Sequence, residues 1–256
     1  MWLPGPLDTV LRTIVAWLVL PAGIVLHSLA AIGVALATRS QERVHRVYRS
    51  FARMCLWVGD TDLSVFGAER IETGRGYVVV SNHESNWDPP CILAALPGVI
   101  LRFVAKRQVM QIPVFGQALR LTGNVTVHRN HSAGDAGRIR SGMEALDPEV
   151  SIHFFAEGSR SRSGELGPFK KGAFATAITH GLQILPIGIA GTRAIWRPGD
   201  VRVRKGRAVL EIGEPVPVDG LSMDDRTRLR DQVHEVVAKL RADASRRLEG
   251  PGPDLG

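Results

Sequence analysis

Hydrophobic and polar positions divide the chain into an apolar N-terminal segment and a longer, mixed remainder. Residues 14–38 contain no Asp, Glu, Lys or Arg. A straight helix of this length would cover roughly 37 Å, enough to cross the ~30 Å hydrocarbon core of a membrane. Pro21 interrupts the run, and residues 6–20 and 22–38, taken separately, are each marginal for a full span. The pattern therefore fits a bent helix or a re-entrant hairpin in one leaflet as well as it fits a crossing.

The same segment has one feature of an export signal. Residues 35–37, Ala-Leu-Ala, have the small-x-small form of a cleavage site. However, Arg12 is the one basic residue that precedes the apolar run, and Asp8 offsets its charge. The run also exceeds the roughly 7–15 residues of a secretory signal. We therefore expect a retained anchor and not a cleaved signal peptide.

A stripe of arginines follows the apolar run directly. Their spacings of 4, 3, 3 and 4 place them on one side of a helix. The five are Arg39, Arg43, Arg46, Arg49 and Arg53. An apolar stripe lies roughly 130° away on the same helical wheel, and it comprises Val44, Val47, Phe51, Met54 and Val58. A basic face beside an apolar anchor suits an anionic cytoplasmic membrane surface, although a simple solvated face is the alternative. Residues 1–58 are thus predicted to be membrane-associating helices of a protein at the cell membrane, with the domain that follows on the cytoplasmic side.

Beyond residue 58, short β-rich runs alternate with helical patterns. The expected strands are 62–66, 77–81, 100–104, 123–128, 151–155, 184–190 and 207–213. The expected helices are 89–96, 113–121, 133–146, 170–180 and 223–248, the last opening with a capping-box pattern at Ser222 and Asp225. This alternation predicts an α/β domain over 59–249, with a central, mostly parallel or mixed sheet of about seven strands flanked by helices. Residues 250–256 are expected to be a flexible tail.

Charge narrows the choice of partners. The 256 residues carry a formal net charge of +7, and the sequence pI is about 10.1. Nucleic acid, anionic lipid or a phosphorylated substrate would all match this charge. Aromatic residues make up 6% of the chain and are not interleaved with basic ones, so we expect no nucleic acid partner. Neither Cys55 nor Cys91 lies in a metal-like cluster, and both are expected to be reduced and buried.

The segment 82–90, NHESNWDPP, carries the first candidate chemistry. Imidazole is the usual general base near neutral pH, and a carboxylate can orient it and stabilise its protonated form. His83 and Asp88 are five residues apart, about 140° on an ideal helix, so they can cooperate only if the chain turns between them. The end of a strand near Ser81 and the prolines at 89 and 90 supply such a turn. A loop histidine and an aspartate that only caps a helix are the alternatives.

Residues 154–174, FFAEGSRSRSGELGPFKKGAF, form the second candidate site. Gly158 lets backbone amides approach a ligand, and guanidinium groups such as that of Arg160 bind phosphate oxygens in a bidentate fork. Glu157 is suited to fixing an arginine or to accepting a hydrogen bond from a substrate hydroxyl. A solvated basic loop is the alternative. No G-x-S-x-G, P-loop or G-x-G-x-x-G pattern occurs, which argues against a serine hydrolase, an NTPase or a dinucleotide enzyme. His128 and His131 lack an obvious third ligand, so no metal site is expected.

These two segments resemble the motifs of the glycerolipid acyltransferases, particularly the lysophosphatidic acid acyltransferases. Asn82-His83-x4-Asp88 is similar to NHxxxxD, and Phe155-Ala156-Glu157-Gly158-Ser159-Arg160-Ser161 is similar to FPEGTRS. Two weaker blocks, 106–129 ending in an arginine and 185–189 with a proline in an apolar strand, follow the family's order. The resemblance covers roughly residues 60–215. Ala156 replaces the family's proline and Ser159 its threonine.

The resemblance implies an enzyme that transfers a fatty acyl group from acyl-CoA or acyl carrier protein to the free hydroxyl of lysophosphatidic acid, giving phosphatidic acid in phospholipid synthesis. His83, oriented by Asp88, would deprotonate the hydroxyl. No metal, no cofactor and no covalent acyl-enzyme would be required. The implied substrate-binding residues are Lys106, Arg129, Glu157, Gly158, Ser159 and Arg160. The alternatives are another lysolipid acceptor (an amino-acid lipid or a glycolipid), a hydrolase, or a non-catalytic module that binds membrane surfaces.

Overall fold

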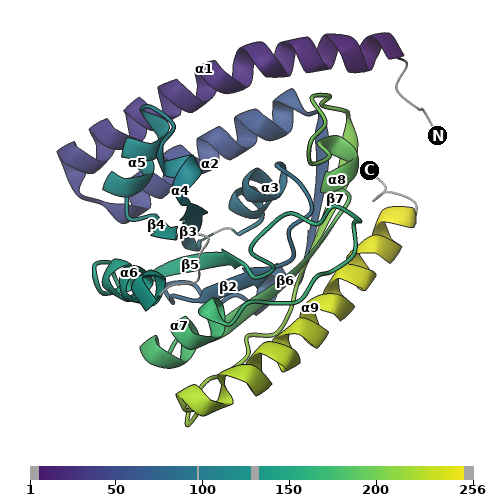
Figure 1. Ribbon diagram of the computed structural model, residues 1–256. Coiled ribbons are helices and arrows are strands. Elements are labelled where there is room, and N and C mark those ends of the chain that lie inside the picture. Colours follow the sequence, from purple (N-terminus) through teal and green to yellow (C-terminus); the bar gives the residue numbers. More distant parts are fainter. Residues whose placement is uncertain (1–5, 97, 128–132, 251–256) are drawn as a thin grey trace.

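The computed structural model describes residues 6–96, 98–127 and 133–250 (Figure 1). Its strands are β1 (Thr61–Phe66), β2 (Val78–Ser81), β3 (Ile100–Lys106), β4 (Val125–Val127), β5 (Val150–Phe155), β6 (Ile184–Ala190) and β7 (Gly206–Ile212). Its α-helices are α1 (Pro6–Thr38), α2 (Gln41–Val58), α3 (Asp88–Ala95), α4 (Arg107–Met110), α5 (Phe115–Leu121), α6 (Ala133–Glu144), α7 (Gly172–His180), α8 (Thr192–Ile195) and α9 (Arg226–Glu249). Two 3-10 turns, Ala68–Arg70 and Met223–Asp225, complete these elements.

The described strands form one sheet in the order β1-β7-β6-β2-β5-β3-β4. Neighbouring strands are parallel except for β6 and β7, which are antiparallel. The predicted mixed sheet of about seven strands, flanked by helices, is confirmed. The expected strand 123–128 begins later, at Val125, because Gly123 is left-handed (φ +87°) and the Asn124 side chain amide donates to the Leu119 carbonyl.

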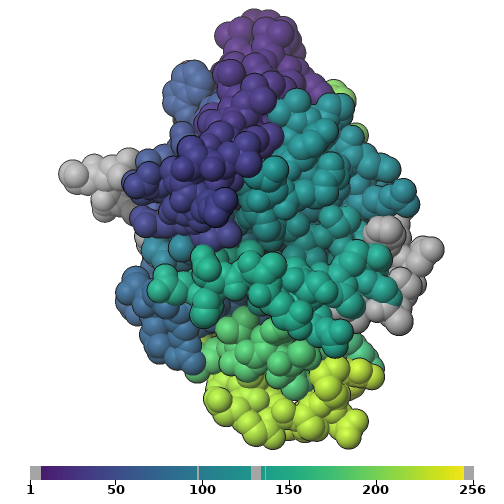
Figure 2. Space-filling model, turned by 90° about the vertical axis from the view of Figure 1, so that its left-hand side faces the viewer, coloured from purple at the N-terminus to yellow at the C-terminus, as the bar shows by residue number. Residues whose placement is uncertain are grey.

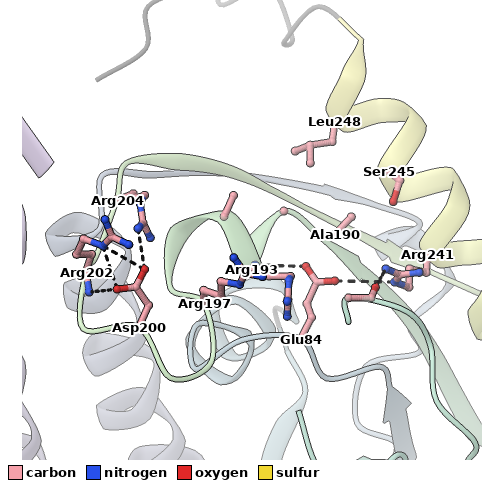
Figure 3. Close-up of a pocket in the computed structure, with 13 residues that line it drawn as sticks. Glu84, Ala190, Arg193, Arg197, Asp200, Arg202, Arg204, Arg241, Ser245 and Leu248 are labelled. Carbon is pink, nitrogen blue, oxygen red and sulfur yellow. Dashed lines mark hydrogen bonds and ion pairs between the residues drawn. The ribbon is translucent and has the colours of Figure 1, made fainter. Parts of the chain in front are cut away.

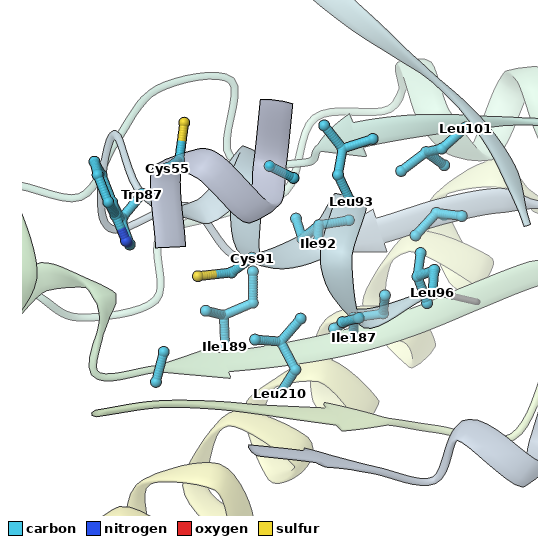
Figure 4. Packing of buried hydrophobic residues seen from close by; sticks show 14 of the residues in the cluster. Cys55, Trp87, Cys91, Ile92, Leu93, Leu96, Leu101, Ile187, Ile189 and Leu210 are labelled. Atoms are coloured by element: carbon cyan, nitrogen blue, oxygen red, sulfur yellow. The ribbon is translucent and has the colours of Figure 1, made fainter. Parts of the chain in front are cut away.

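Helices cover both faces of the sheet, which explains why its central strands are apolar on both sides. On one face, α2 and α3 pack on residues of β6 and β7 (Figure 4). The buried residues there include Cys55, Trp87, Cys91, Leu96, Ile187 and Leu210. On the other face, α6, α7 and α9 bury residues such as Val80, Phe154, Phe174 and Val233. The two cysteines are free and buried, as expected.

The N-terminal apolar segment forms one continuous helix with Pro21 inside it, so of the alternatives that the sequence left open, the hairpin at Pro21 is excluded. Proline removes one backbone hydrogen bond, but Ala16 and Leu20 are buried against the domain, and this packing supports the helix through the interruption. The chain turns instead after Thr38. Arg39 is left-handed (φ 52°), and the Ser40 hydroxyl caps α2 by accepting from the Arg43 amide at 3.2 Å. Figure 2 shows α1 on the outside at the top of the molecule, at the opposite end from α9.

The two stripes predicted for residues 39–58 lie on different sides of α2. Val44 and Val58 are buried, and Phe51 and Met54 pack against the same core. Of the five arginines, four are exposed, whereas Arg49 is half-buried. α1 is the one helix among the described residues that is long and apolar enough to cross a membrane, over Leu7–Thr38. The helix retains a row of exposed large apolar side chains, which includes Leu11, Trp17, Leu18, Leu26 and Leu36.

Candidate active site

The candidate residues converge at the carboxyl ends of three adjacent strands. The central order β6-β2-β5 is parallel, so all three strands end at the same edge of the sheet. His83 lies two residues after β2, Glu157 two residues after β5 and Thr192 two residues after β6. Ligand sites of open α/β sheets lie at this edge.

The structure brings His83 and Asp88 into direct contact. The Nδ1 atom of His83 lies 2.7 Å from Oδ2 of Asp88. Asp88 is fully buried, whereas His83 is partly exposed and stacks on Phe155 with ring centroids 3.7 Å apart. A carboxylate can only accept, so Nδ1 carries the hydrogen and Nε2 is left with a lone pair. This is the arrangement of a general base oriented by a carboxylate.

Asp88 is held by four hydrogen bonds. Oδ2 accepts from His83 Nδ1 and from the backbone amides of Glu84 (2.8 Å) and Ser85 (2.9 Å). Oδ1 accepts from the Thr192 hydroxyl at 2.5 Å. Asp88 is the first residue of α3, after the N-cap Trp87, and the prolines at 89 and 90 have no N–H for its carboxylate to cap. The carboxylate therefore turns back to the loop, and the alternative of a simple capping aspartate does not apply.

A second buried carboxyl group lies behind the first. The Thr192 hydroxyl is also within 3.1 Å of Glu84 Oε1, and the Arg193 amide donates to the same oxygen at 3.4 Å. Burial, together with the nearby charge of Asp88, raises the pKa of Glu84 to about 7. The Thr192 hydroxyl therefore lies between two carboxyl groups. One is that of Asp88, which accepts four hydrogen bonds, and the other is that of Glu84, which changes charge near neutral pH.

His153 is a second histidine beside the site, but its environment differs from that of His83. It is fully buried on β5, and its Nε2 lies 3.0 Å from the Ser81 hydroxyl. Burial lowers the pKa of His153 to about 3, and the neighbouring His83 adds to the effect. His153 is thus a neutral packing residue, in edge contact with Phe155.

Two polar side chains fix the backbone around His83. The Asn82 amide both donates to and accepts from the backbone of Ile189 (2.9 and 2.8 Å), which ties the end of β2 to β6. Glu157 accepts from the His83 amide through Oε1 (2.7 Å) and from the Gly167 amide through Oε2 (2.9 Å). Both Glu157 oxygens thus bind backbone amides, where the sequence suggested an arginine or a substrate hydroxyl as the partner.

The predicted phosphate-binding loop lies beside the histidine. The Ser161 amide donates to the His83 carbonyl at 2.8 Å. Gly158 is left-handed (φ +72°), and a Cβ atom there would lie 2.7 Å from Cε of Lys170, so both the backbone and the neighbour favour glycine. Ser159 and Arg160 are exposed, and Nη1 of Arg160 donates to Oδ1 of Asn86. That bond joins the two sequence motifs.

The remaining predicted residues have different outcomes. Lys106 ends β3, the neighbour of β5, and so lies at the same edge of the sheet. Arg129 lies outside the described residues. The sequence interpretation missed Thr192, because 104 positions separate it from Asp88. The available signal was its position, since it follows a predicted strand at the edge where His83 and Glu157 also lie.

Comparisons with known proteins agree with this geometry. The family model described as Acyltransferase matches residues 62–190. The chain is 31% identical over 195 residues to the 1-acyl-sn-glycerol-3-phosphate acyltransferase alpha of Ovis aries, covering 75% of this chain and 67% of that one. It is 28% identical over 188 residues to the 1-acyl-sn-glycerol-3-phosphate acyltransferase of Limnanthes douglasii, covering 73% and 66%.

Among solved structures, the fold is similar to that of the 1-acyl-sn-glycerophosphate acyltransferase of Thermotoga maritima. The TM-score is 0.79 and the identity 26%, and the match covers 94% of this chain and 98% of that one. The matched family region contains the His83–Asp88 pair and the Glu157–Arg160 loop. The chain therefore belongs to the acyltransferase family, and the protein is an O-acyltransferase.

Proposed function

We propose that the protein transfers a fatty acyl group from acyl-CoA or acyl carrier protein to the free hydroxyl of lysophosphatidic acid, giving phosphatidic acid. The observation that carries this proposal is the His83 Nδ1–Asp88 Oδ2 contact of 2.7 Å beside a loop of exposed cationic residues. The similar proteins from Ovis aries and Limnanthes douglasii, both named for 1-acyl-sn-glycerol-3-phosphate, support the same acceptor.

The chemistry follows from the free nitrogen of His83. Nε2 removes the proton of the acceptor hydroxyl as its oxygen attacks the thioester carbonyl, and the new C–O bond gives a tetrahedral oxyanion. Collapse of this intermediate breaks the C–S bond, and the thiolate leaving group takes the proton back from the imidazolium. Asp88 stabilises the positive ring between these two transfers and fixes its orientation.

Arg160, together with Lys106 and Arg129, is assigned to the phosphate of the acceptor. A guanidinium group binds phosphate oxygens through charge-assisted hydrogen bonds. Arg160 lies between Glu157, whose side chain accepts from the His83 amide, and Ser161, whose amide donates to the His83 carbonyl, so a phosphate bound there lies close to the base. Gly158 leaves room for the Lys170 side chain, which adds positive charge to this region.

We further propose that α1 lies in the plane of the membrane surface, with the catalytic domain on the cytoplasmic side. α1 packs along α2 and α5, and the Trp17 indole donates to the carbonyl of Val201 at 2.9 Å. A crossing α1 would carry the exposed arginines of α2 toward the hydrocarbon, which is costly. An in-plane helix instead buries its apolar row in the leaflet and leaves the basic stripe to anionic headgroups.

Membrane extraction tests the anchor. The protein is expected to retain α1 and to stay with membranes through a high-salt wash, because salt screens charges but does not weaken apolar burial. Replacing Leu11, Leu18 and Leu26, which are exposed on α1, with Glu is expected to release it. Release of the wild-type chain by salt alone, or a mature N-terminus at Thr38, would contradict the proposal.

The substrate assignment is tested by mass spectrometry of products formed from acyl-CoA and a mixed panel of lysolipids. Phosphatidic acid is the expected main product. A product with another headgroup would retain the acyltransferase and change the acceptor. Free thiol released without any lysolipid would indicate a hydrolase and reject the transfer step.

A further inference from the structure

A cavity rich in arginine opens beside the catalytic dyad, and the proposed mechanism does not use it. Its volume is about 570 Å³, and it lies between α8 with the loop that follows and the last turns of α9. Its guanidinium groups belong to Arg193, Arg197, Arg202, Arg204 and Arg241. The carboxyl groups of Glu84 and Asp200 also line it, so positive groups outnumber negative ones by five to two. We call this cavity the arginine pocket (Figure 3).

Four of these arginines are fixed in place by the protein itself. Arg193 donates to the carbonyls of Ser161 (2.9 Å) and Arg162 (2.5 Å). Arg241 donates to the Gly164 carbonyl. Arg202 and Arg204 both bind Asp200, as Figure 3 shows. A guanidinium group has five N–H donors, so each keeps donors for a ligand, and its ordering cost is already met before binding.

Arg197 differs from the other four. It is exposed, and its side chain makes no hydrogen bond or ion pair with any of the described residues. In Figure 3 it lies between the Asp200 group and Glu84. An unpaired guanidinium that lines a cationic cavity is available to an anion, and its removal leaves the protein's own contacts intact.

The position of the arginine pocket relates it to the reaction. Glu84 lines the pocket, and it also shares the Thr192 hydroxyl with Asp88. The proposed reaction brings together two phosphate-bearing substrates, and the Glu157–Arg160 loop is assigned to only one of them. Ala190, Ala194 and Leu248 add an apolar surface to the cavity wall. Guanidinium groups with apolar surface match a ligand that combines phosphates with a purine ring.

We propose that the arginine pocket binds the phosphorylated nucleotide end of an acyl-CoA donor, an inference that rests on the proposed function. The thioester arm then extends past Glu84 to His83, while the acceptor phosphate occupies the Arg160 side. The two substrates thereby enter from different sides of the dyad, each with its own cationic site.

Binding of adenosine 3′,5′-bisphosphate, measured by titration calorimetry at low ionic strength, tests the site without requiring any turnover. Wild-type protein is expected to bind it. Arg197→Ser is expected to raise the dissociation constant about 5- to 20-fold, because it removes a charge-assisted hydrogen bond at an exposed position. Arg226→Ser is the matched control, because it removes the same charge from the exposed first turn of α9. It is expected to shift the dissociation constant less than twofold.

Steady-state kinetics then relate the site to the donor. Arg197→Ser is expected to raise the KM for acyl-CoA about 5- to 20-fold, to move the KM of the lysolipid much less, and to have little effect with acyl-pantetheine, which lacks the nucleotide. An equal rise in the KM for acyl-CoA and for acyl-pantetheine would overturn the proposal. So would an effect seen only with acyl carrier protein as donor, which would identify the pocket as a contact for that protein.

Failure of the site and failure of the proposed function give different results. No binding of the bisphosphate, or equal weakening by Arg197→Ser and Arg226→Ser, rejects the site whatever the enzyme acylates. A third outcome is that Arg197→Ser binds the bisphosphate as the wild type does but binds phosphatidylglycerol vesicles more weakly. This result would make the pocket a lipid headgroup site and reject the proposal. Arg197-dependent bisphosphate binding without acylation of any lysolipid would retain the site and reject the acceptor assignment.

Discussion

The NHESNWD segment and the Glu157–Arg162 loop face the same site but are held in opposite ways. In the first, Asp88 is fully buried and accepts four hydrogen bonds, and His83 is fixed at its ring and at its backbone. In the second, the backbone is bound to neighbours, but the side chains of Ser159 and Arg160 are exposed. The His83 ring is thus positioned by the protein, whereas the cationic end of Arg160 has one hydrogen-bond partner among the described residues, Asn86.

This difference separates two functions of the site. A general base must be held within a few tenths of an ångström of the productive geometry, and internal hydrogen bonds supply that rigidity. A phosphate-binding arginine can complete its hydrogen bonds with the substrate itself. Substitutions in the first region should therefore lower turnover, and those in the second should weaken substrate binding.

The largest effect is expected for His83→Ala. Loss of a positioned general base lowers turnover by roughly 10²–10⁴-fold. The variant is expected to fold normally, since His83 is partly exposed and its backbone bonds to Glu157 and Ser161 remain. The measurement is kcat at saturating acceptor, with the melting temperature as a check of folding. His180→Ala, at the end of α7, is the control. Near-wild-type turnover in His83→Ala would reject the mechanism.

In the Glu157–Arg162 loop, Arg160→Ala is expected to have the next largest effect, and this effect should be on substrate binding. Removing a charge-assisted hydrogen bond costs roughly 1.5–3 kcal/mol, which predicts a 10- to 150-fold rise in the KM of lysophosphatidic acid. The KM of the donor should change much less. Arg162→Ala is the matched control, because Arg162 is also exposed and its side chain makes no hydrogen bond or ion pair among the described residues. An equal rise in KM for both substrates would show that Arg160 has a structural role, and the distinction between the two regions would no longer hold.

The sequence predicted much of the fold because its signals are local. Apolar runs bounded by turn residues marked each strand, and the arginine spacing marked the solvent side of α2. Pro21 left a bent helix, a hairpin and a crossing open, because the local effect of a proline does not show whether tertiary packing, here of Ala16 and Leu20, supports the helix through it. The strand order, with β7 between β1 and β6, depends on contacts distant in sequence and could not be predicted from the pattern.

The same limit applies to the site. His83, Asp88 and Arg160 could be proposed from the sequence because each lies in a contiguous motif. Thr192 contacts Asp88 only because β6 pairs with β2, a contact that no spacing encodes. The environment of Glu84 likewise depends on burial, since an isolated glutamate after a histidine gives no indication of a pKa near 7.

Thr192→Val tests whether Asp88 needs its fourth hydrogen bond. Valine keeps the shape of the side chain and removes the hydroxyl that donates to Oδ1. As a positioning residue, Thr192 acts through Asp88, so kcat is expected to fall roughly 5- to 30-fold with little change in either KM. The acid limb of the pH–rate profile should move as well, and Thr192→Ser should restore both. A drop in melting temperature with an unchanged pH profile would instead show that Thr192 only stabilises the fold.

The smallest effect is expected for Glu84→Gln, and it concerns stability. The folded protein holds the Glu84 proton up to pH of about 7, whereas an unfolded carboxyl group releases it near its ordinary pKa of 4.5. Between these values the folded state binds more protons than the unfolded state, so stability falls as pH rises through this window. The shift from 4.5 to about 7 corresponds to at most roughly 3 kcal/mol at neutral and alkaline pH.

Glutamine resembles the protonated form and does not titrate, so Glu84→Gln removes this penalty. Its melting temperature is expected to match that of the wild type near pH 5 and to exceed it by several degrees at pH 8, as measured by scanning calorimetry across that range. Glu235→Gln, at an exposed position of α9, should show a constant difference. A melting temperature of Glu84→Gln that falls in parallel with the wild type would mean that Arg241, 3.8 Å from Glu84, keeps the carboxylate ionised throughout. In that case the buried region behind Asp88 carries a fixed charge, and the Thr192 hydroxyl is shared between two permanent carboxylates.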